Sequence, residues 1–427
     1  MQSNKLLLRN ARVIDPTNKI DDTIDVLIEK EKIVKIGRHL LSPDADAIDL
    51  SDMVLSPGFI DMHVHLREPG QEDSETIRSG TMAAAAGGFT AVACMPNTRP
   101  VNDNPEVTEF ILQKATTEAI IDVYPIGAVT KNQAGEELAD LRGLKAAGAV
   151  AVSDDGKPVA NSRIMRKALE LCETFGLIVI DHCEDPNLFE HGVMHEGRYS
   201  KKLGVQGIPS ACEEIMVARN ILLSKLAGAR LHMAHLSTEG SMEFIRRARA
   251  EECKVTAEVT PHHFALTDAS VTLDNTNTKM NPPLRTKSDV EAVLAAISDG
   301  TVDVIASDHA PHHASLKHVA YDKAAFGVAG LETSVSIGLD RLVNSKLISF
   351  GRFVELYSLN PARILGIERG IFVGAEANLT VFHPSKKIKV NASEFQSKSR
   401  NTPFDGWTLR GCPMATIVRG RIVWSRL

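Results

Sequence analysis

The segment Phe59-Ile-Asp-Met-His-Val-His-Leu-Arg67 decides the fold of this 427-residue chain. Its apolar run ends in His63 and His65, and residues i and i+2 of a strand point to the same side. Both imidazoles can therefore reach one metal ion, and zinc accepts nitrogen and carboxylate ligands. Taken alone, the pair could equally be two histidines that hydrogen-bond backbone at a strand end. The residues downstream decide between these interpretations.

Seven further apolar runs follow this segment and alternate with helical patterns, which predicts βα units and a parallel sheet. The eight expected strands are 59–65, 89–95, 121–128, 149–153, 177–182, 231–236, 255–259 and 304–307. Expected crossover helices include 74–86, 162–175, 213–226, 240–250 and 288–298. Eight strands indicate an α/β fold of the (β/α)8 TIM-barrel type, in which chemistry gathers at the carboxyl ends of the strands.

Both ends of the chain alternate apolar and polar residues in the manner of β-strands. Strands are expected at 6–13, 24–28, 33–36 and 53–55, and again at 378–382, 387–390 and 415–424. Neither end is large enough to bury a core of its own. We therefore expect residues 1–56 and 366–427 to form one antiparallel, composite β-sandwich domain, and residues 57–365 to form the barrel.

Five of the eight expected strands end in histidine or aspartate, so these side chains should open onto one face of the barrel. The strand ends are His63 and His65, Asp154-Asp155, Asp181-His182, Ala234-His235 and Ser307-Asp308. Imidazole and carboxylate are the ligands of hydrolytic zinc sites, and a carboxylate can bridge two ions. We predict zinc, with two ions favoured over one. One ion would lie on His63, His65 and Asp308 and the other on His182 and His235, with Asp154 or Asp155 between them.

Around these strand ends the sequence resembles the dihydroorotase family, class I bacterial type, of the cyclic amidohydrolase superfamily. The resemblance covers nearly the whole chain and rests on motifs such as 57–70, Met95-Pro-Asn-Thr98, 279–285, 306–312 and Gly330-Leu-Glu332. It implies metal ligands His63, His65, Asp155, His182, His235 and Asp308. It also implies substrate contacts from His65, Arg67, Asn97, Asn281, His312, Phe326 and Gly327. Asp154 should then orient backbone, since adjacent strand residues cannot share one face.

The resemblance also implies the reaction, the interconversion of N-carbamoyl-L-aspartate and L-dihydroorotate in pyrimidine biosynthesis. Zinc would lower the pKa of a bound water so that hydroxide attacks the ring amide carbon. Asp308 would act as general base and then as the acid that protonates the leaving nitrogen. The guanidinium of Arg67 can hold the substrate carboxylate in a bidentate fork, which Asn97 and His312 would complete.

Composition and charge favour a small-molecule substrate. A formal net charge of -6 without a run of Lys and Arg argues against nucleic acid or an anionic membrane as the main partner. The sequence shows neither a secretory signal nor a stretch as long as a membrane span, so we expect a cytoplasmic protein. We also expect a homo-oligomer, a dimer, which could associate with aspartate transcarbamoylase.

Two alternative functions remain open from the sequence. Allantoinase and dihydropyrimidinase should share the fold, but they are expected to bridge their metals with a carboxylated lysine. Asp154-Asp155 stands at that position here, and Lys157 lies beyond Gly156. The other alternative is a non-catalytic partner of aspartate transcarbamoylase, and the intact set of ligands argues against it. The long segment 310–330 is expected to be an active-site loop.

Overall fold

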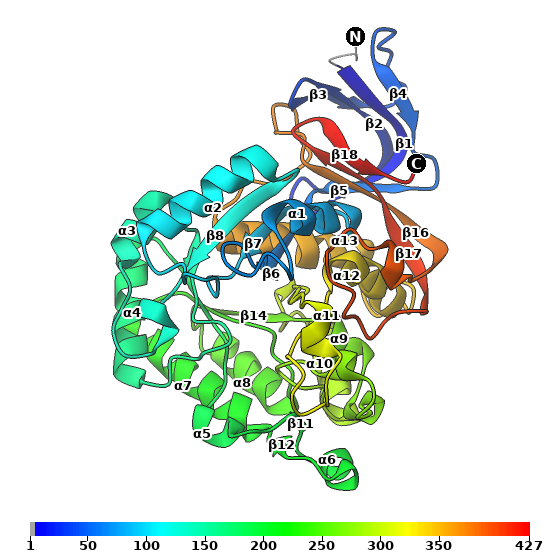
Figure 1. Cartoon of the computed structure of the whole chain (residues 1–427). Coiled ribbons are helices and arrows are strands. Elements are labelled where there is room, and N and C mark those ends of the chain that lie inside the picture. Colours follow the sequence, from blue (N-terminus) through cyan, green and yellow to red (C-terminus); the bar gives the residue numbers. More distant parts are fainter. Residues whose placement is uncertain (1–4) are drawn as a thin grey trace.

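A computed structural model of the chain describes residues 5–427. Residues 1–4, which belong to the expected composite domain, lie outside the described part. The chain forms a barrel with an outer layer of helices, and both chain ends gather at one side of it in a separate sheet (Figure 1). The first and last parts of the sequence therefore lie side by side.

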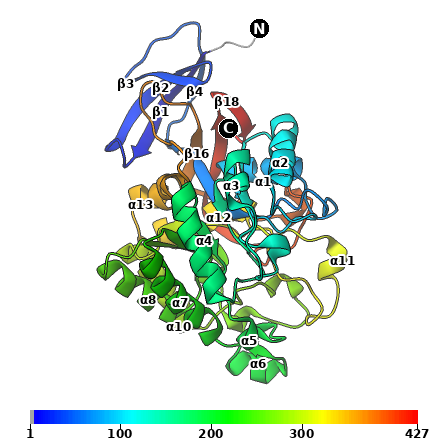
Figure 2. The same ribbon diagram turned by 90° about the vertical axis from the view of Figure 1, so that its left-hand side faces the viewer.

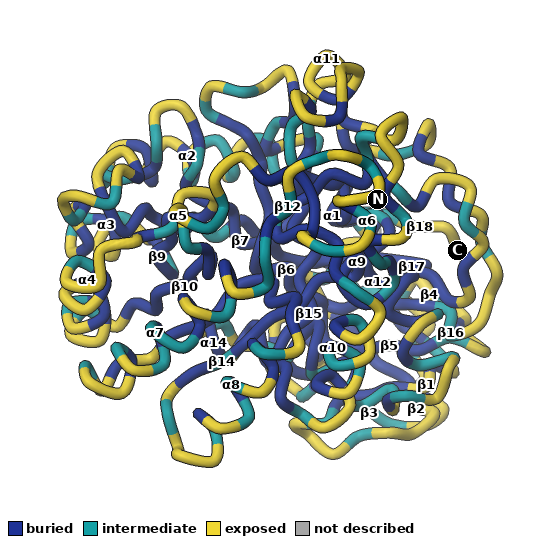
Figure 3. Tube along the Cα trace, turned by 90° about the horizontal axis from the view of Figure 1, so that it is seen from below, coloured by how far each residue is buried: buried dark blue, intermediate teal, exposed yellow. Residues whose placement is uncertain are grey.

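All eight expected barrel strands are present, and each pairs in parallel with the next. They are β6 (Phe59–Val64), β7 (Phe89–Cys94), β8 (Asp122–Gly127), β9 (Ala151–Val152), β10 (Val179–Asp181), β13 (Leu231–Met233), β14 (Val255–Val259) and β15 (Val304–Ile305). A parallel bridge between Val64 and His309, with His65 N–H donating to the His309 carbonyl at 2.8 Å, links the first strand to the last. Seen from below, β6 and β15 lie in the buried centre and the exposed chain surrounds them (Figure 3). The (β/α)8 prediction is confirmed.

Helices cover the outside of the barrel, and the five expected crossover helices are among them. The covering helices are α1 (Ile77–Ala86), α2 (Pro105–Glu118), α3 (Leu141–Ala147), α4 (Ser162–Phe175), α7 (Ala211–Ala227), α8 (Glu239–Ala250), α10 (Lys287–Asp299) and α12 (Leu331–Gly338). Helices α4, α7, α8 and α10 stand next to one another along one flank (Figure 2). Within residues 5–427, no helix has both the length and the apolar character that a membrane crossing requires.

Helix α4 shows why these segments form where the sequence places them. Asn161 accepts hydrogen bonds from two backbone N–H groups of the first turn, and Gly176 ends the helix with a φ of 69°. An asparagine N-cap and a left-handed glycine after the last turn are the favoured signals for the two ends of a helix. Its buried stripe, which faces the barrel, consists of Met165, Ala168, Leu169 and Cys172.

Shorter elements occupy the loops between the barrel strands and the end of the barrel. After β10 the chain forms α5 (Pro186–Phe189), β11 (Met194–His195), α6 (Arg198–Leu203) and β12 (Gly207–Ile208). Later short helices are α9 (Pro261–Ala265), α11 (Ala314–Lys317), α13 (Phe350–Val354) and α14 (Asn360–Leu365). Helix α11 lies inside the 310–330 segment that the sequence predicts to be an active-site loop.

The two chain ends pair as one eight-stranded sheet. Its strands are β1 (Lys5–Asp15), β2 (Ile20–Glu29), β3 (Lys32–Gly37), β4 (Asp46–Asp49), β5 (Val54–Pro57), β16 (Leu379–Lys389), β17 (Thr408–Val418) and β18 (Arg421–Ser425). Strand β5 joins the halves, because it pairs antiparallel with β16. Apolar residues of both ends, including Leu8, Val26, Leu55, Leu379 and Ile417, share one core.

One detail of the expected sheet is wrong. Strand β1 pairs in parallel with both β4 and β5, whereas the sequence analysis expects an antiparallel unit. The segment after β3 returns the chain so that β4 and β5 run in the same direction as β1. Alternation of apolar residues shows which face is buried but not the direction of a strand. We propose the divisions between the two domains at residues 56/57 and 365/366, the first at the last residue of β5 and the second at the end of α14.

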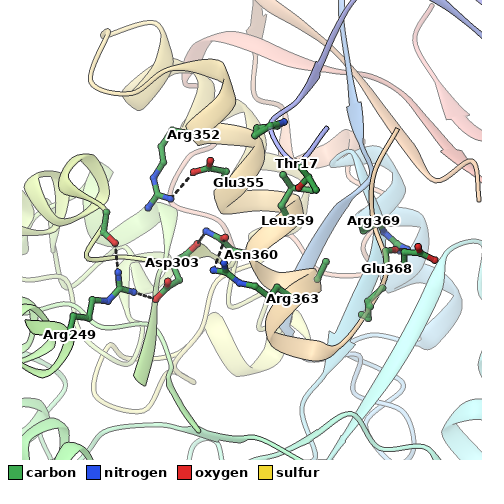
Figure 4. A pocket seen from close by; sticks show the side chains of 14 residues that line it. Thr17, Arg249, Asp303, Arg352, Glu355, Leu359, Asn360, Arg363, Glu368 and Arg369 are labelled. Carbon is green, nitrogen blue, oxygen red and sulfur yellow. Dashed lines mark hydrogen bonds and ion pairs between the residues drawn. The ribbon is translucent and has the colours of Figure 1, made fainter. Parts of the chain in front are cut away.

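An arginine–carboxylate network holds the amino-terminal end of the barrel, around a cavity of about 640 Å³ (Figure 4). Arg249 donates a hydrogen bond to the Asp303 carboxylate, directly before β15, and another to the Gly300 carbonyl. Arg352 pairs with Glu355 at 3.0 Å and also donates to a backbone carbonyl before β15. These charges are matched within the protein, so we assign them to stability. The opposite end of the barrel carries the residues expected to do chemistry.

Candidate active site

Asp155 lies at the centre of the histidine cluster at the carboxyl ends of the strands. Its Oδ1 is 3.4 Å from His63 Nε2, 3.4 Å from His182 Nδ1 and 3.4 Å from His235 Nε2. Its Oδ2 is 3.5 Å from His65 Nε2. All of these side chains are buried. Asp155 thus belongs to two groups of possible ligands, one with His63 and His65 and one with His182 and His235.

Asp308 completes the side of the cluster nearest to β6. Its Oδ1 lies 3.2 Å from His65 Nε2 and 3.6 Å from His63 Nε2. The backbone of Asp308 has a φ of 45°, and Arg67 and His235 have φ values of 61° and 33°. Residues other than glycine adopt this left-handed region at a cost, and such residues concentrate at functional sites. Here the turns after the strands place the side chains of Asp308, Arg67 and His235 in the wall of the cavity.

The neighbouring aspartate, Asp154, has the role that strand geometry predicts. Its Oδ1 accepts hydrogen bonds from the N–H groups of Val129 (2.8 Å) and Thr130 (3.1 Å), and it also binds the Thr130 hydroxyl. Lys157 is exposed beyond Gly156, outside the cluster. The carboxylate that the structure places between the imidazoles is therefore that of Asp155.

Glu258 is a site residue that the sequence analysis missed. This fully buried carboxylate contacts His63 Nδ1 at 2.7 Å and His232 Nε2 at 3.1 Å. It also accepts a hydrogen bond from the backbone N–H of His235 at 3.2 Å. His232 is thus a packed histidine, held by Glu258 and Thr256. One feature of the sequence could have identified it: Glu258 is a charged residue inside the apolar strand β14, and a buried charge needs a partner.

The contact with Glu258 orients the His63 ring. Because Nδ1 contacts this carboxylate, Nε2 faces Asp155 and Asp308. Nε2 is buried and has no hydrogen-bond partner among residues 5–427. An unpartnered imidazole nitrogen between two carboxylates is the arrangement of a metal ligand whose other ring nitrogen is oriented by a carboxylate.

The electrostatics of the cluster favour a bound cation. Burial opposes charge on His182, yet the carboxylates of Asp155 and Glu184 outweigh it and raise the pKa of His182 to about 10. Burial also opposes ionisation of Asp155, but His63, His182 and His235 hold its pKa well below the ordinary value. The carboxylates therefore draw positive charge into a buried site. A divalent metal ion supplies such charge, and imidazole and carboxylate are ligands that zinc accepts.

A cavity of about 380 Å³ opens beside the cluster. Its lining includes every residue that the resemblance assigns to substrate binding: His65, Arg67, Asn97, Asn281, His312, Phe326 and Gly327. The lining also includes residues that were not predicted as substrate contacts, among them Glu184 and Phe189. Glu184 accepts a hydrogen bond from Asn281 at 2.6 Å, and the Phe189 ring lies 6.0 Å from that of Phe326.

Arg67 is a buried cation in the wall of this cavity. Its Nε donates to the carbonyl of Pro311 at 3.1 Å, and no carboxylate among residues 5–427 forms an ion pair with it. Burial lowers the pKa of Arg67 to about 10, so the guanidinium stays charged near neutral pH. A buried charge without an ionic partner is costly, and an anionic group of a ligand would relieve that cost.

Asn97 and His312 flank the same part of the cavity. Asn97 Oδ1 accepts a hydrogen bond from His65 Nδ1 at 2.8 Å, which leaves the Asn97 amide N–H groups as donors. His312 Nε2 donates to the Phe326 carbonyl at 2.6 Å, which fixes the ring. Burial, followed by the charge of Arg67, lowers the pKa of His312 to about 3, so this histidine is neutral.

Fold and site together define a class of protein, the (β/α)8 barrels that carry a histidine–aspartate cluster at the carboxyl ends of their strands. The structure is similar to that of an L-hydantoinase from Arthrobacter aurescens, with a TM-score of 0.89 and 24% identity over 99% of this chain and 96% of that one. A D-hydantoinase structure matches with a TM-score of 0.87 at 23% identity, over 98% of this chain and 95% of the other. These likenesses establish the fold.

Sequence comparison identifies the family within this class. A family model described as Dihydro-orotase-like matches residues 52–241. A protein named dihydroorotase from Citrifermentans bemidjiense is 50% identical over 422 residues, 98% of this chain and 99% of that protein. The protein of that name from Syntrophus aciditrophicus is 50% identical over 424 residues, 99% of each chain. The chain belongs to the dihydroorotase family.

Glu258 provides a test of the metal site that does not depend on activity. Glu258→Gln should lower zinc affinity by about 10- to 100-fold, because a ligating histidine loses the carboxylate that orients it. Titration of the metal-free protein with zinc against a chelator of known affinity measures this. Glu213→Gln is a matched control, since this buried glutamate binds Ser237 and Ser241 rather than an imidazole. Equal zinc affinity in both variants would contradict the role of Glu258.

Proposed function

We propose that this protein is a zinc-dependent dihydroorotase that interconverts L-dihydroorotate and N-carbamoyl-L-aspartate in pyrimidine biosynthesis. One observation carries the proposal: a cluster of histidines and aspartates suited to hydrolysis opens onto the same cavity as Arg67, a buried cation without an ionic partner among residues 5–427. Dihydroorotate combines the two features that such a site would recognise, a cyclic amide bond and a carboxylate. The names of the similar proteins support the same reaction.

The residues that would hold the metal follow from the cluster. His63, His65 and Asp308 would hold one ion, His182 and His235 the other, and Asp155 would lie between them. When bound, zinc would polarise the amide carbonyl and make water more acidic. We favour two ions over one, because the same carboxylate of Asp155 contacts both pairs of histidines.

Asp308 is the group that we assign to proton transfer. It lines the cavity, and despite its burial His65 and His63 hold its pKa below the ordinary value. The carboxylate is therefore ionised and ready to accept a proton from the attacking water. As the ring opens, Asp308 returns this proton to the amide nitrogen, and in ring closure the same transfers run in reverse.

Arg67 and Asn97 would fix the substrate by its carboxylate. The guanidinium can form two parallel hydrogen bonds to a carboxylate, and the free amide of Asn97 can donate a further one. Phe189 and Phe326 form an apolar part of the cavity wall and would keep bulk water from the opened ring. The carboxylate thus sets the position of the ring amide relative to Asp308.

Arg67→Met should lower kcat/KM for dihydroorotate. The loss of transition-state stabilisation should be about 2 to 5 kcal/mol, as for truncation of a buried charge pair. The same substitution should reduce turnover of dihydrouracil, a cyclic ureide without the carboxylate, far less. Steady-state hydrolysis rates of both compounds measure the difference. Equal losses on the two substrates would rule out carboxylate recognition by Arg67.

The decisive test of the function is a spectrophotometric assay of dihydroorotate hydrolysis by the purified protein, with allantoin and dihydrouracil as competing substrates. We expect turnover of dihydroorotate to be far faster than that of the other two compounds, to be lost on chelation and to be restored by zinc. Turnover of allantoin or dihydrouracil instead would favour the alternative hydrolases. A zinc-loaded protein that turns over none of them would favour a non-catalytic partner of aspartate transcarbamoylase.

We further propose that the enzyme works in the cytoplasm as a homodimer and can associate with aspartate transcarbamoylase. The support is its expected small-molecule substrate and the resemblance of its sequence. Light scattering after size-exclusion chromatography measures the mass of the assembly, alone and with the transcarbamoylase added.

A further inference from the structure

A segment from outside the barrel sequence reaches the loops at the barrel mouth. Between β16 and β17 the chain leaves the composite sheet, and Ser397, Ser399 and Asn401 are buried. The Ser399 hydroxyl contacts the carbonyls of His312 at 2.9 Å and Ser74 at 2.8 Å. The backbone carbonyl of Asn401 accepts a hydrogen bond from Ala329 N–H at 2.9 Å. Residues 397–401 therefore pack against the active-site loop 310–330.

The side chain of Asn401 is bound entirely to backbone groups of residues that line the cavity. Its Nδ2 donates to the carbonyls of Ala310 and Gly327, each at 3.1 Å. Its Oδ1 accepts from His312 N–H at 3.2 Å. Ala310, His312 and Gly327 all line the cavity, whereas Asn401 does not. The carboxamide thus lies behind the cavity wall and links the 310–312 stretch to Gly327.

The same contacts lead to the cation that we assign to substrate binding. Ala310 and His312 are the two neighbours of Pro311, and the Pro311 carbonyl accepts the hydrogen bond from Arg67 Nε at 3.1 Å. Fixing both neighbours fixes this carbonyl, and the carbonyl orients the guanidinium. We propose that Asn401 is a positioning residue for the substrate carboxylate, acting through Pro311 on Arg67. The proposal rests on the proposed function, because it assigns the carboxylate to Arg67.

Only a carboxamide has the right set of groups for this position, two N–H donors on nitrogen and one acceptor oxygen. Alanine would remove the Asn401 partner of the buried Ala310 carbonyl and His312 N–H, and it would leave the Gly327 carbonyl with Lys317 alone. Aspartate would keep the acceptor for His312 N–H but would place a carboxylate against two carbonyl oxygens. Both changes should therefore loosen the 310–312 stretch relative to Gly327.

The loop should still fold without Asn401, because a second buried group holds it from another side. The Lys317 ammonium donates to the carbonyls of Ala325 at 2.8 Å, Gly327 at 3.2 Å and Lys279 at 3.3 Å. The Phe326 carbonyl also accepts from His312 Nε2. Loss of the Asn401 side chain should thus shift the loop without unfolding it.

The first experiment compares Asn401→Ala and Asn401→Asp with a matched control. Asn344 is the control, since its Nδ2 donates to the backbone carbonyls of Leu339, Pro384 and Arg410, and none of these residues lines the cavity. Both Asn401 variants should raise KM for dihydroorotate about 10-fold or more and change kcat less than about 3-fold, as expected when binding is weakened uniformly. Zinc content should stay at the wild-type level. Asn344→Ala should lower Tm without changing KM.

A double-mutant cycle separates positioning of Arg67 from a general loosening of the protein. In an Arg67→Met background, Asn401→Ala should change KM by less than about 2-fold, because the group on which it acts is gone. An unchanged KM in the wild-type background, or an equal rise in both backgrounds, would overturn the proposal. A wild-type protein without dihydroorotate turnover would instead defeat the proposed function, so the two failures are distinguishable. If Asn401→Ala does not fold, Asn401→Asp is carried through the same cycle.

Discussion

Asp155→Ala is expected to lose zinc and turnover together, and turnover should fall by at least about a thousandfold, the several kcal/mol that a catalytic metal supplies. The reason is that one carboxylate contacts His63, His65, His182 and His235 at 3.4 to 3.5 Å, so both groups of ligands lose their common member. Metal analysis of the purified variant and the dihydroorotate assay measure the two losses. Wild-type zinc content in Asp155→Ala would contradict the assignment.

Lys157→Ala is the matched control for Asp155→Ala and separates two branches of the amidohydrolases. Lys157 is exposed beyond Gly156, so its removal should leave zinc content and turnover nearly unchanged. A lysine carbamate has to be built from carbon dioxide, whereas an aspartate bridge needs no such reagent. Reconstitution of the metal-free protein with zinc in carbon-dioxide-free buffer should therefore restore full activity. A strict requirement for bicarbonate would move the chain toward the hydantoinase-like branch.

Asp308→Asn should lower kcat by about 100- to 10,000-fold, the range that a positioned general acid and base contributes. The amide is nearly isosteric with the carboxylate, but it cannot accept and return the proton. His63, His65, Asp155, His182 and His235 remain, so zinc content should fall much less than in Asp155→Ala. Single-turnover rates together with metal analysis measure this. If kcat falls only in proportion to lost zinc, Asp308 is a ligand without a role in proton transfer.

Much of the barrel could be predicted because its signals are local. Each strand is a short apolar run. In a parallel barrel, a histidine or aspartate at the carboxyl end of a strand lies at the one face where all strands end. His63, His65 and Asp308 are therefore brought together as expected, and so are Asp155, His182 and His235.

The parts that escaped prediction depend on contacts between distant segments. Glu258 appears in the sequence as one polar residue in a strand, and only the packing of β14 shows that it lies between two histidines. The parallel pairing of β1 with β5 depends on the path of the connecting loop. Asn401 follows the barrel sequence entirely, and its contact with Ala310 spans 91 residues.

The pairing of β5 with β16 also has a consequence for biosynthesis. The ribosome releases β5 early, but its partner emerges only after about 320 further residues, as the contact between Phe59 N–H and Thr380 shows. Until then the β5 edge of the first strands is unpaired, and such edges bind other extended chains. The nascent chain must therefore fold a whole barrel while this edge stays open. Aggregation during synthesis, rather than instability of the finished enzyme, is then the hazard to which this architecture exposes the chain.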